Sequence, residues 1–232
     1  MPPRTLAVAG VLLTALAVPA GARAAVIDPP LKPCYVTVGD ALGERESVTF
    51  RASGFTPNSK VDLALDGQPV PGGIALQTDA SGALGALTPL SIPAPYVAAG
   101  SRDFTISLIE QGNPASVATA IAKTTALGIS VTPKSARPSR RIRFRGNGFT
   151  GRKRVYAHYV YRGKVRKTVR MARPTGPCGS WQARKRQIPI PNPATGRWIV
   201  QFDQLRRYVE PPDIPSVYVR LTIRVRRVFH GG

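Results

Sequence analysis

Few side chains of this sequence could form a catalytic centre, and they lie far apart along the chain. Cys178 and His158 are the residue types that supply a thiol nucleophile and its general base, but the 232 residues include only 2 Cys and 2 His. The other histidine, His230, lies two residues from the C-terminus, where chain ends are generally disordered. We therefore predict that the protein is not an enzyme. A hydrolase that brings His158 or Cys178 together with an acid is the alternative.

Metal chemistry has equally little support in the sequence. Zinc sites need Cys and His ligands at short spacings, and no such spacing occurs here. Asp62, Asp66 and Asp79 could supply oxygen ligands to calcium. The same acids stand in Asp-Gly and Thr-Asp sequences, whose ordinary turn chemistry explains them without a metal. We predict no metal and no cofactor.

The basic residues are concentrated in one half of the chain. The whole sequence has a formal net charge of +21, with 33 Lys and Arg against 12 Asp and Glu. Residues 26–128 hold six basic and nine acidic residues, a net charge of −3, whereas residues 129–232 hold 25 basic residues, 20 of them Arg, and three acids, a net charge of +22. Such a charge needs solvent counterions or a polyanionic partner.

Within the basic half, charged residues alternate with apolar ones, as expected for strands with one outer face. Arginine binds phosphate or carboxylate through two parallel hydrogen bonds. We predict a polyanion-binding surface on strands and basic loops, composed of Arg141, Arg143, Arg145, Arg152, Lys153, Arg154, Arg184, Lys185, Arg186, Arg220, Arg224 and Arg226. The alternative is an Arg-rich composition without a specific role, which should affect both halves alike.

The elements that would position these residues are strands. The 22 Gly and 23 Pro make long helices improbable, and period-two alternation recurs at 48–52, 61–65, 104–108 and 217–226. Two stretches are ambiguous. Residues 115–126 fit a last strand better than an Ala-rich helix, and 197–202 read as a strand followed by a short helical turn around 204–208.

The two halves share a repeated motif. Residues 48–56 (VTFRASGFT) align without a gap onto 142–150 (IRFRGNGFT), and the match continues to 61 and 155 with six identities in fourteen positions. The offset of about 94 residues is the size of one small β domain. Five aromatic residues of the second half could stack on bases or sugars, but we favour a place for them in the core and at the edges of a β-sandwich: Tyr156, Tyr159, Tyr161, Trp181 and Trp198.

The run VTFRASGFTP at 48–57, followed by VDLALDG at 61–67 and TDASG at 78–82, resembles bacterial immunoglobulin-like repeats of secreted and surface proteins. The resemblance covers most of residues 31–125, and the second half keeps the first motif. It implies a β-sandwich that serves as a spacer, scaffold or adhesion module, in a family without shared catalytic residues. We predict an all-β protein with two tandem immunoglobulin-like β-sandwich domains, at 25–127 and 128–232.

The first 24 residues have the pattern of a cleaved signal peptide. Arg4 precedes an apolar run from Leu6 to Ala17, and Ala22-Arg23-Ala24 fits the cleavage pattern. The run is too short to span a bilayer. We therefore expect a secreted or envelope-associated protein, in an oxidising compartment where Cys34 and Cys178 can pair. If the domains are strung end to end, Cys34 should lie at the far pole, so this bond predicts domains folded back side by side; pairing between two molecules is the alternative.

Export decides which polyanions the protein would meet. We predict binding to an anionic cell-wall polymer or an anionic membrane surface, with other envelope proteins as further partners. The sequence carries no helix-turn-helix, zinc-finger or RNA-binding signature, so nucleic acid would bind only non-specifically. The alternative is a protein–protein adhesion or assembly module that uses exposed sheet edges.

Overall fold

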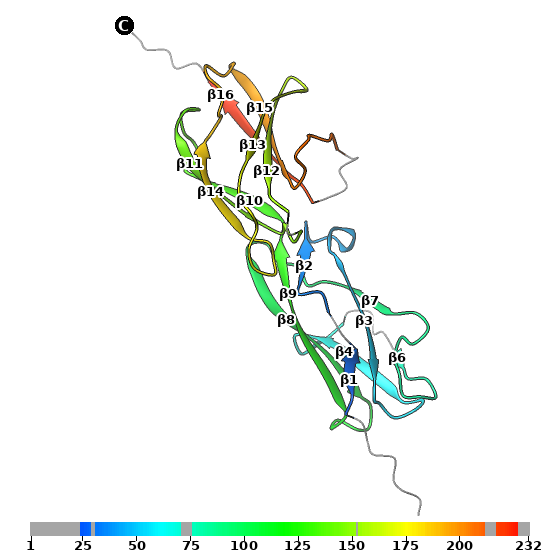
Figure 1. The fold of residues 1–232 in the computed structure, drawn as a ribbon. Helices are drawn as coiled ribbons and strands as arrows, with labels where there is room; N and C mark the ends of the chain where they lie inside the picture. Colours follow the sequence, from blue (N-terminus) through cyan, green and yellow to red (C-terminus); the bar gives the residue numbers. More distant parts are fainter. Residues whose placement is uncertain (1–23, 29–30, 71–75, 152, 212–216, 227–232) are drawn as a thin grey trace, which may run out of the picture.

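The computed structural model describes residues 24–28, 31–70, 76–151, 153–211 and 217–226 (Figure 1). The expected signal peptide lies outside these ranges except for Ala24. Among the described residues, all regular elements are strands apart from one 3-10 turn at Leu42–Glu44. None of them forms a helix long and apolar enough to cross a membrane. The predicted all-β fold class is confirmed.

The first sandwich consists of two sheets. Its strands are β1 (Val26–Asp28), β2 (Cys34–Thr37), β3 (Ser47–Ser53), β4 (Lys60–Leu65), β5 (Gln68–Pro69), β6 (Leu76–Gln77), β7 (Leu90–Pro93), β8 (Ser101–Glu110) and β9 (Val117–Ala126). One sheet has the order β1-β3-β7, and the other has the order β2-β9-β8-β4-β5, with β6 also paired to β4. The chain thus changes sheets between β1 and β2, and β2 runs parallel to the last strand, β9. This strand order is that of an immunoglobulin-like sandwich.

The second sandwich repeats the arrangement with fewer strands. It contains β10 (Gly128–Thr132), β11 (Arg141–Asn147), β12 (Tyr156–Tyr161), β13 (Lys164–Arg170), β14 (Trp181–Arg186), β15 (Gly196–Asp203) and β16 (Val219–Val225). Its sheets have the orders β10-β11-β14 and β13-β12-β15-β16. The chain places β10 and β11 in the first sheet and β12 and β13 in the second, returns to the first with β14, and ends with β15 and β16 in the second. These crossings between sheets are those of seven-stranded immunoglobulin-like domains.

The repeated motif occupies the same place in both sandwiches. β3 and β11 are each the central strand of a three-stranded sheet, and they share one pattern of exposed and buried residues. Phe50 and Phe144 point into their respective cores, together with Phe55 and Phe149. The alternation in the sequence therefore predicted the right strand and the right buried face in both halves.

The two sandwiches lie end to end, as Figure 1 shows, and a disulfide joins them. Cys34 and Cys178 have a Cα–Cα distance of 5.1 Å and are both buried. The predicted pairing is confirmed, but the expectation of domains folded side by side is wrong. Cys34 is not in the first strand. It begins β2, which runs along β9 toward the junction, with Thr37 opposite Ala126.

The two ambiguous stretches have different outcomes. Residues 117–126 form the strand β9, as favoured. After β15 the expected helical turn around 204–208 is absent from the described chain, which bends there instead. The N–H of Leu205 donates to the Asp203 carboxylate, and the Leu205 carbonyl accepts from His158. Backbone groups that a helical turn would use are therefore bonded to side chains.

Candidate functional site

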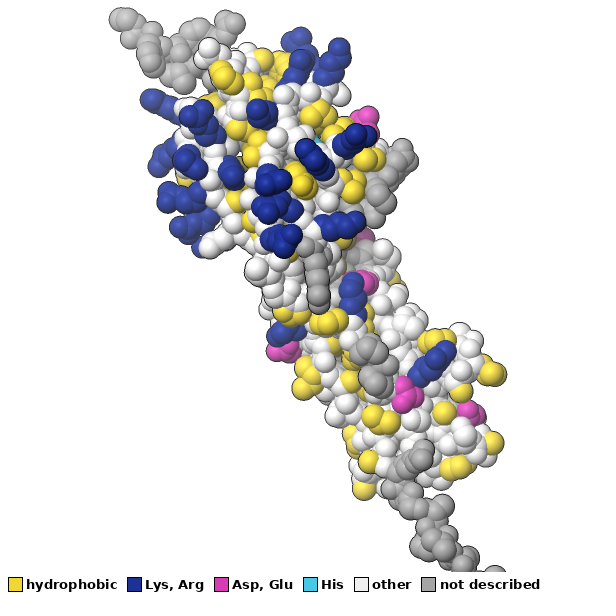
Figure 2. Space-filling model, viewed as in Figure 1, with side chains coloured by type: hydrophobic (Ala, Val, Ile, Leu, Met, Phe, Trp, Pro, Cys, Tyr) yellow, Lys and Arg dark blue, Asp and Glu magenta, His cyan; other side chains and the backbone are white. Residues whose placement is uncertain are grey.

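Five arginines share the outer face of the β10-β11-β14 sheet. Arg141, Arg143 and Arg145 alternate along β11 with buried residues, so all three point outward. On the neighbouring strand, Arg186 lies opposite Arg141 and Arg184 lies opposite Arg143. All five are exposed. We call these five residues the arginine face; Figure 2 shows how strongly Lys and Arg gather over this sandwich compared with the other.

The surroundings of the arginine face contain hydroxyl and amide groups. Ser130 and Thr132 on β10 lie opposite Arg145 and Arg143, and Gln182 on β14 flanks Arg145 on the other side. Among the described residues, no salt bridge joins any Lys or Arg of the second sandwich to a carboxylate. Like charges placed opposite each other destabilise a sheet, so the arginines work against folding.

The first sandwich shows what the same sheet looks like without this charge. In the repeat alignment, Ser47 and Thr49 of β3 correspond to Arg141 and Arg143, and Thr49 lies opposite Ser91. The third position is Arg in both repeats, but Arg51 lies opposite Asp28 on β1. The framework thus forms with neutral side chains at the positions of Arg141 and Arg143, and with an acid opposite the one arginine that it keeps. The fold itself does not demand the arginine face.

The remaining predicted cations do not join the arginine face. Arg220 and Arg224 point outward from β16 in the other sheet of the sandwich, where Arg197 of β15 lies opposite Arg224. The outer faces of two packed sheets point in opposite directions. Lys185 pairs with the buried Ile142 and is half-buried on the inner side of its strand. The predicted set is therefore divided between two faces of the sandwich.

The predicted loop cations are separate again. Lys153 and Arg154 lie between β11 and β12, and the Lys153 carbonyl accepts a hydrogen bond from the Gln204 amide. Arg226 follows β16 and is exposed. Arg152 lies outside the described residues.

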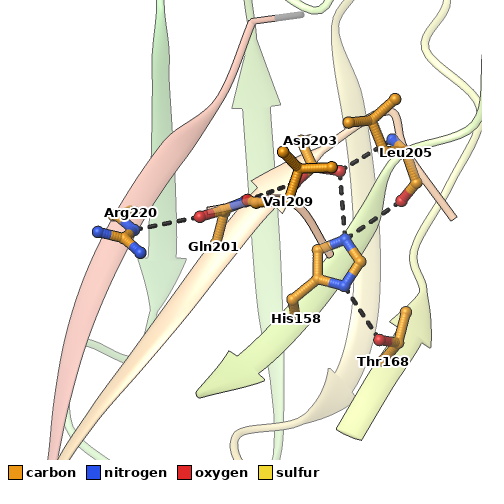
Figure 3. A network of polar contacts seen from close by, with 7 residues as sticks. All are labelled: His158, Thr168, Gln201, Asp203, Leu205, Val209 and Arg220. Carbon is orange, nitrogen blue, oxygen red and sulfur yellow. Dashed lines mark hydrogen bonds and ion pairs between the residues drawn. The ribbon is translucent and has the colours of Figure 1, made fainter. Parts of the chain in front are cut away.

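A buried polar network lies on the outer face of the β13-β12-β15-β16 sheet, covered by the segment that follows β15 (Figure 3). Nε2 of His158 is 3.2 Å from Oδ1 of Asp203 and 3.1 Å from the Leu205 carbonyl oxygen. Both partners are acceptors, so Nε2 carries the proton. Nδ1 is 3.0 Å from the Thr168 hydroxyl oxygen. Sequence reasoning singled out His158 but could not identify Asp203, which lies 45 residues further along the chain.

The order hydroxyl, imidazole, carboxylate is the one that activates a nucleophile, and it supplies the acid that the hydrolase alternative requires. Its geometry nevertheless serves the fold. His158 and Asp203 are both fully buried, so a substrate cannot reach the ring. Gln201 continues the network by donating to Asp203 and to the Val209 carbonyl, while its oxygen accepts from Arg220. The network thereby ties the segment after β15 to the sheet.

The other candidates for chemistry also have structural roles. Cys178 is in the disulfide and offers no thiol. Asp79 accepts hydrogen bonds from the Ser81 hydroxyl and from backbone N–H groups of its own turn, and these bonds lower its pKa. Burial works against ionisation of Asp66, but hydrogen bonds from Arg102 and the backbone outweigh it and lower the pKa. These acids are engaged in turns and ion pairs, as the turn interpretation expects.

The aromatic residues of the second half belong mainly to its core. Tyr159, Trp181 and Trp198 are buried, and Tyr161 stacks on Trp198 with a centroid distance of 4.8 Å. Burial raises the pKa of the Tyr159 hydroxyl. The core interpretation is therefore confirmed for these three buried rings, which are not available to stack on a ligand.

Comparison with known proteins adds little to the strand order. No family model and no curated protein matches this chain. Among solved structures, a tetra-tandem repeat of a large adhesion protein is 12% identical, with 83% of this chain and 48% of that chain covered and a TM-score of 0.29. The present chain thus spans about half the length of that repeat structure.

Two further structures are equally distant. Fibronectin(III)-like modules of Clostridium thermocellum CbhA are 11% identical, covering 90% of this chain and 100% of that chain at a TM-score of 0.26. Bovine butyrophilin is 10% identical, covering 88% and 98% at a TM-score of 0.30. The immunoglobulin-like assignment therefore rests on the strand order of the two sandwiches. The disulfide is of a kind that persists in oxidising compartments, which agrees with an extracellular location.

Proposed function

We propose that the arginine face binds a linear polyanion of the cell envelope, an anionic cell-wall polymer bearing phosphate or carboxylate groups. In this proposal the protein is a non-catalytic binding module, and the first sandwich is the scaffold that presents the second. The observation that carries it is the contrast between the duplicated sheets. Ser47, Thr49 and Ser91 occupy the framework positions that hold Arg141, Arg143 and Arg184 in the second copy.

The spacing of the arginines suits a linear ligand. Alternate residues of a strand are about 6.7 Å apart, and neighbouring strands lie about 4.8 Å apart. Arg141, Arg143 and Arg145 therefore form one row, and Arg186 and Arg184 form a second row beside it. Each guanidinium can take a phosphate or carboxylate through two hydrogen bonds. A polyanion that lies along the two strands would contact several guanidinium groups in succession.

A polymer fits this surface better than a membrane does. Proteins that lie on bilayers generally add apolar side chains that enter the headgroup region. The residues beside the arginines on the neighbouring strands are Ser130, Thr132 and Gln182, which are all exposed and polar. Vesicles of anionic lipid are therefore the second arm of the binding experiment, and preference for them over polymer would contradict the proposal.

The test is binding to polyphosphate and to polygalacturonate across a salt series. Each neutralised charge on a flexible polyanion contributes about −0.7 to the slope of log K against log salt. Five contacts give a slope of about −3.5, or a loss of roughly a hundredfold in affinity between 50 and 200 mM salt. Binding that does not change with salt would exclude the electrostatic mechanism.

A pair of matched variants separates the arginine face from net charge alone. Arg143→Thr with Arg184→Ser copies the Thr49–Ser91 pair of the first sandwich and should reduce the salt slope by about 1.4. The control removes the cross-strand pair Arg197 and Arg224 from the opposite face. Equal losses in the two variants would show that binding depends on overall charge, and would overturn the assignment to this face.

A further inference from the structure

A groove lies at the junction of the two sandwiches, at the end of the arginine-bearing sheet. Its volume is about 690 Å³, within the range of small-ligand sites. One wall comes from Ala98–Gly100 of the first sandwich, which offers only small side chains. The other comes from β10, β11 and β14 and includes Ser130, Arg145, Asn147 and Gln182.

These polar residues continue the outer face of the sheet toward the junction. The cross-strand row after the paired arginines is Ser130, Arg145 and Gln182, and the next row holds Gly128 and Asn147. Paired arginines thus give way to a single arginine among hydroxyl and amide groups. The side chains of Ser130, Arg145 and Gln182 are all exposed, so all three can reach a ligand.

Asn147 is oriented by the protein. The Ser180 hydroxyl donates to its side-chain oxygen at 2.9 Å. The amide nitrogen, with two donors, is therefore left for a ligand. Hydroxyl, amide and guanidinium groups together match the hydroxyls of a sugar and one attached acid group, because each can donate to or accept from ring hydroxyls while Arg145 forms a two-pronged pair with an anion.

We propose that this junction groove binds a short acidic oligosaccharide, with its carboxylate or phosphate on Arg145 and its hydroxyls on Ser130, Asn147 and Gln182. The groove shares Arg145 with the arginine face but differs from it in chemistry, because it offers one cation beside hydroxyl and amide groups rather than a row of cations. It deepens the proposed function by naming a sugar-containing polymer as the partner. The identity of the polymer rests on the proposed function, whereas binding of the short oligosaccharide does not.

The disulfide holds the walls of the groove together. Cys178 lies between Thr175 and Ser180, which both line the groove, and its bond to Cys34 ties this segment to the first sandwich. The Cys178 carbonyl accepts from the Gly148 N–H at 3.0 Å. Opening the disulfide should therefore loosen the groove while leaving the arginine face on its sheet.

The experiment measures the affinity of trigalacturonate, with uncharged maltotriose as the reference. Ala99 is exposed in the groove wall, so Ala99→Trp fills the groove without changing any charge. It should weaken trigalacturonate by about tenfold or more. Because Arg145 is the one residue of the arginine face in the groove lining, the salt slope of polyphosphate should fall by no more than about 0.7. Ala86→Trp, at an exposed position of the same sandwich outside the groove lining, is the matched control and should change neither.

The outcomes separate this site from the arginine face. Arg143→Thr with Arg184→Ser should reduce polyphosphate binding and spare trigalacturonate. Retention of trigalacturonate affinity within about twofold in Ala99→Trp, or equal binding of maltotriose, would overturn the groove proposal while the arginine face stands. Circular dichroism of each variant excludes misfolding as the cause of a loss. If the unsubstituted protein binds trigalacturonate but does not bind polyphosphate at any salt concentration, this result contradicts the proposed function instead.

Discussion

Replacing Arg143 by threonine should make the second sandwich more stable, because the arginine face is a set of mutually repelling charges. Arg143 lies between Arg141 and Arg145 on β11 and opposite Arg184 on β14. For charges about 8 Å apart in water, each pair costs about 0.5 kcal/mol. Three neighbours give about 1.5 kcal/mol without salt, and a Debye length of about 10 Å at 0.1 M roughly halves this. We expect a gain of about 1 kcal/mol in the free energy of unfolding at low salt.

Urea unfolding followed by tryptophan fluorescence measures this gain in the right domain. Both tryptophans, Trp181 and Trp198, lie in the core of the second sandwich. The difference between Arg143→Thr and the parent protein should be largest in dilute buffer and mostly lost at 1 M salt, where the Debye length is about 3 Å. A part that persists at 1 M reports the better strand propensity of threonine. Arg51→Thr, in the first sandwich, should leave this transition unmoved.

If Arg143→Thr lowers the stability at both salt concentrations, or raises it equally at both, the arginines do not repel one another measurably. The arginine face would then carry no folding cost that a bound polyanion must offset, even if polyanions bind.

Three further results should follow from the structure. Cys34→Ser with Cys178→Ser removes a cross-link across a sequence separation of 144 residues. The chain-entropy model predicts that the free energy of unfolding then falls by about 5 kcal/mol, and an unchanged urea midpoint would contradict this. Gly146→Ala places a Cβ 2.4 Å from Nε1 of Trp181, so the thermal midpoint should fall by the equivalent of about 1–3 kcal/mol. Side-chain and backbone hydrogen bonds lower the pKa of Asp79. The contribution of Asp79 to stability is therefore present above its unfolded pKa of about 3.9 and is lost as the pH falls through the lower folded value. Asp79→Asn should remove that part of the acid-induced decrease in thermal midpoint.

The local pattern of the sequence predicted the strands but not their partners. Alternation at 48–52 and 142–146 identified both the strand and its buried side, because the side-chain period of a strand is two and needs no knowledge of the rest of the chain. The same alternation placed Arg220 and Arg143 on outer surfaces. It could not show that their strands belong to opposite sheets, since pairing across sheets depends on the order of the whole sandwich.

The location of Cys34 shows a second limit. The sequence suggested one first strand at the far pole, whereas β1 and β2 belong to different sheets. Proline lacks the N–H that a sheet ladder needs, and Pro29 and Pro30 stand between the two strands in the sequence. These two prolines indicated that one strand ends there and that a second strand begins after them, which can belong to the other sheet. The pairing of His158 with Asp203 carried no comparable signal, because it depends on the register between β12 and β15.

A need for solubility does not account for the charge of the second sandwich. The first sandwich has the same framework and carries its polar outer face with Ser47 and Thr49 opposite Pro93 and Ser91. A solubilising charge would be satisfied by lysine, whose ammonium is more strongly hydrated than a guanidinium, yet the second half has 20 Arg and five Lys. Arginines set opposite arginines cost stability that evenly spread charges would not. A row of guanidinium groups therefore makes physical sense where a ligand supplies the missing anions. The sheet of the first sandwich, where Ser47, Thr49 and Ser91 stand at these positions, shows that the same framework folds without the cross-strand arginine pairs.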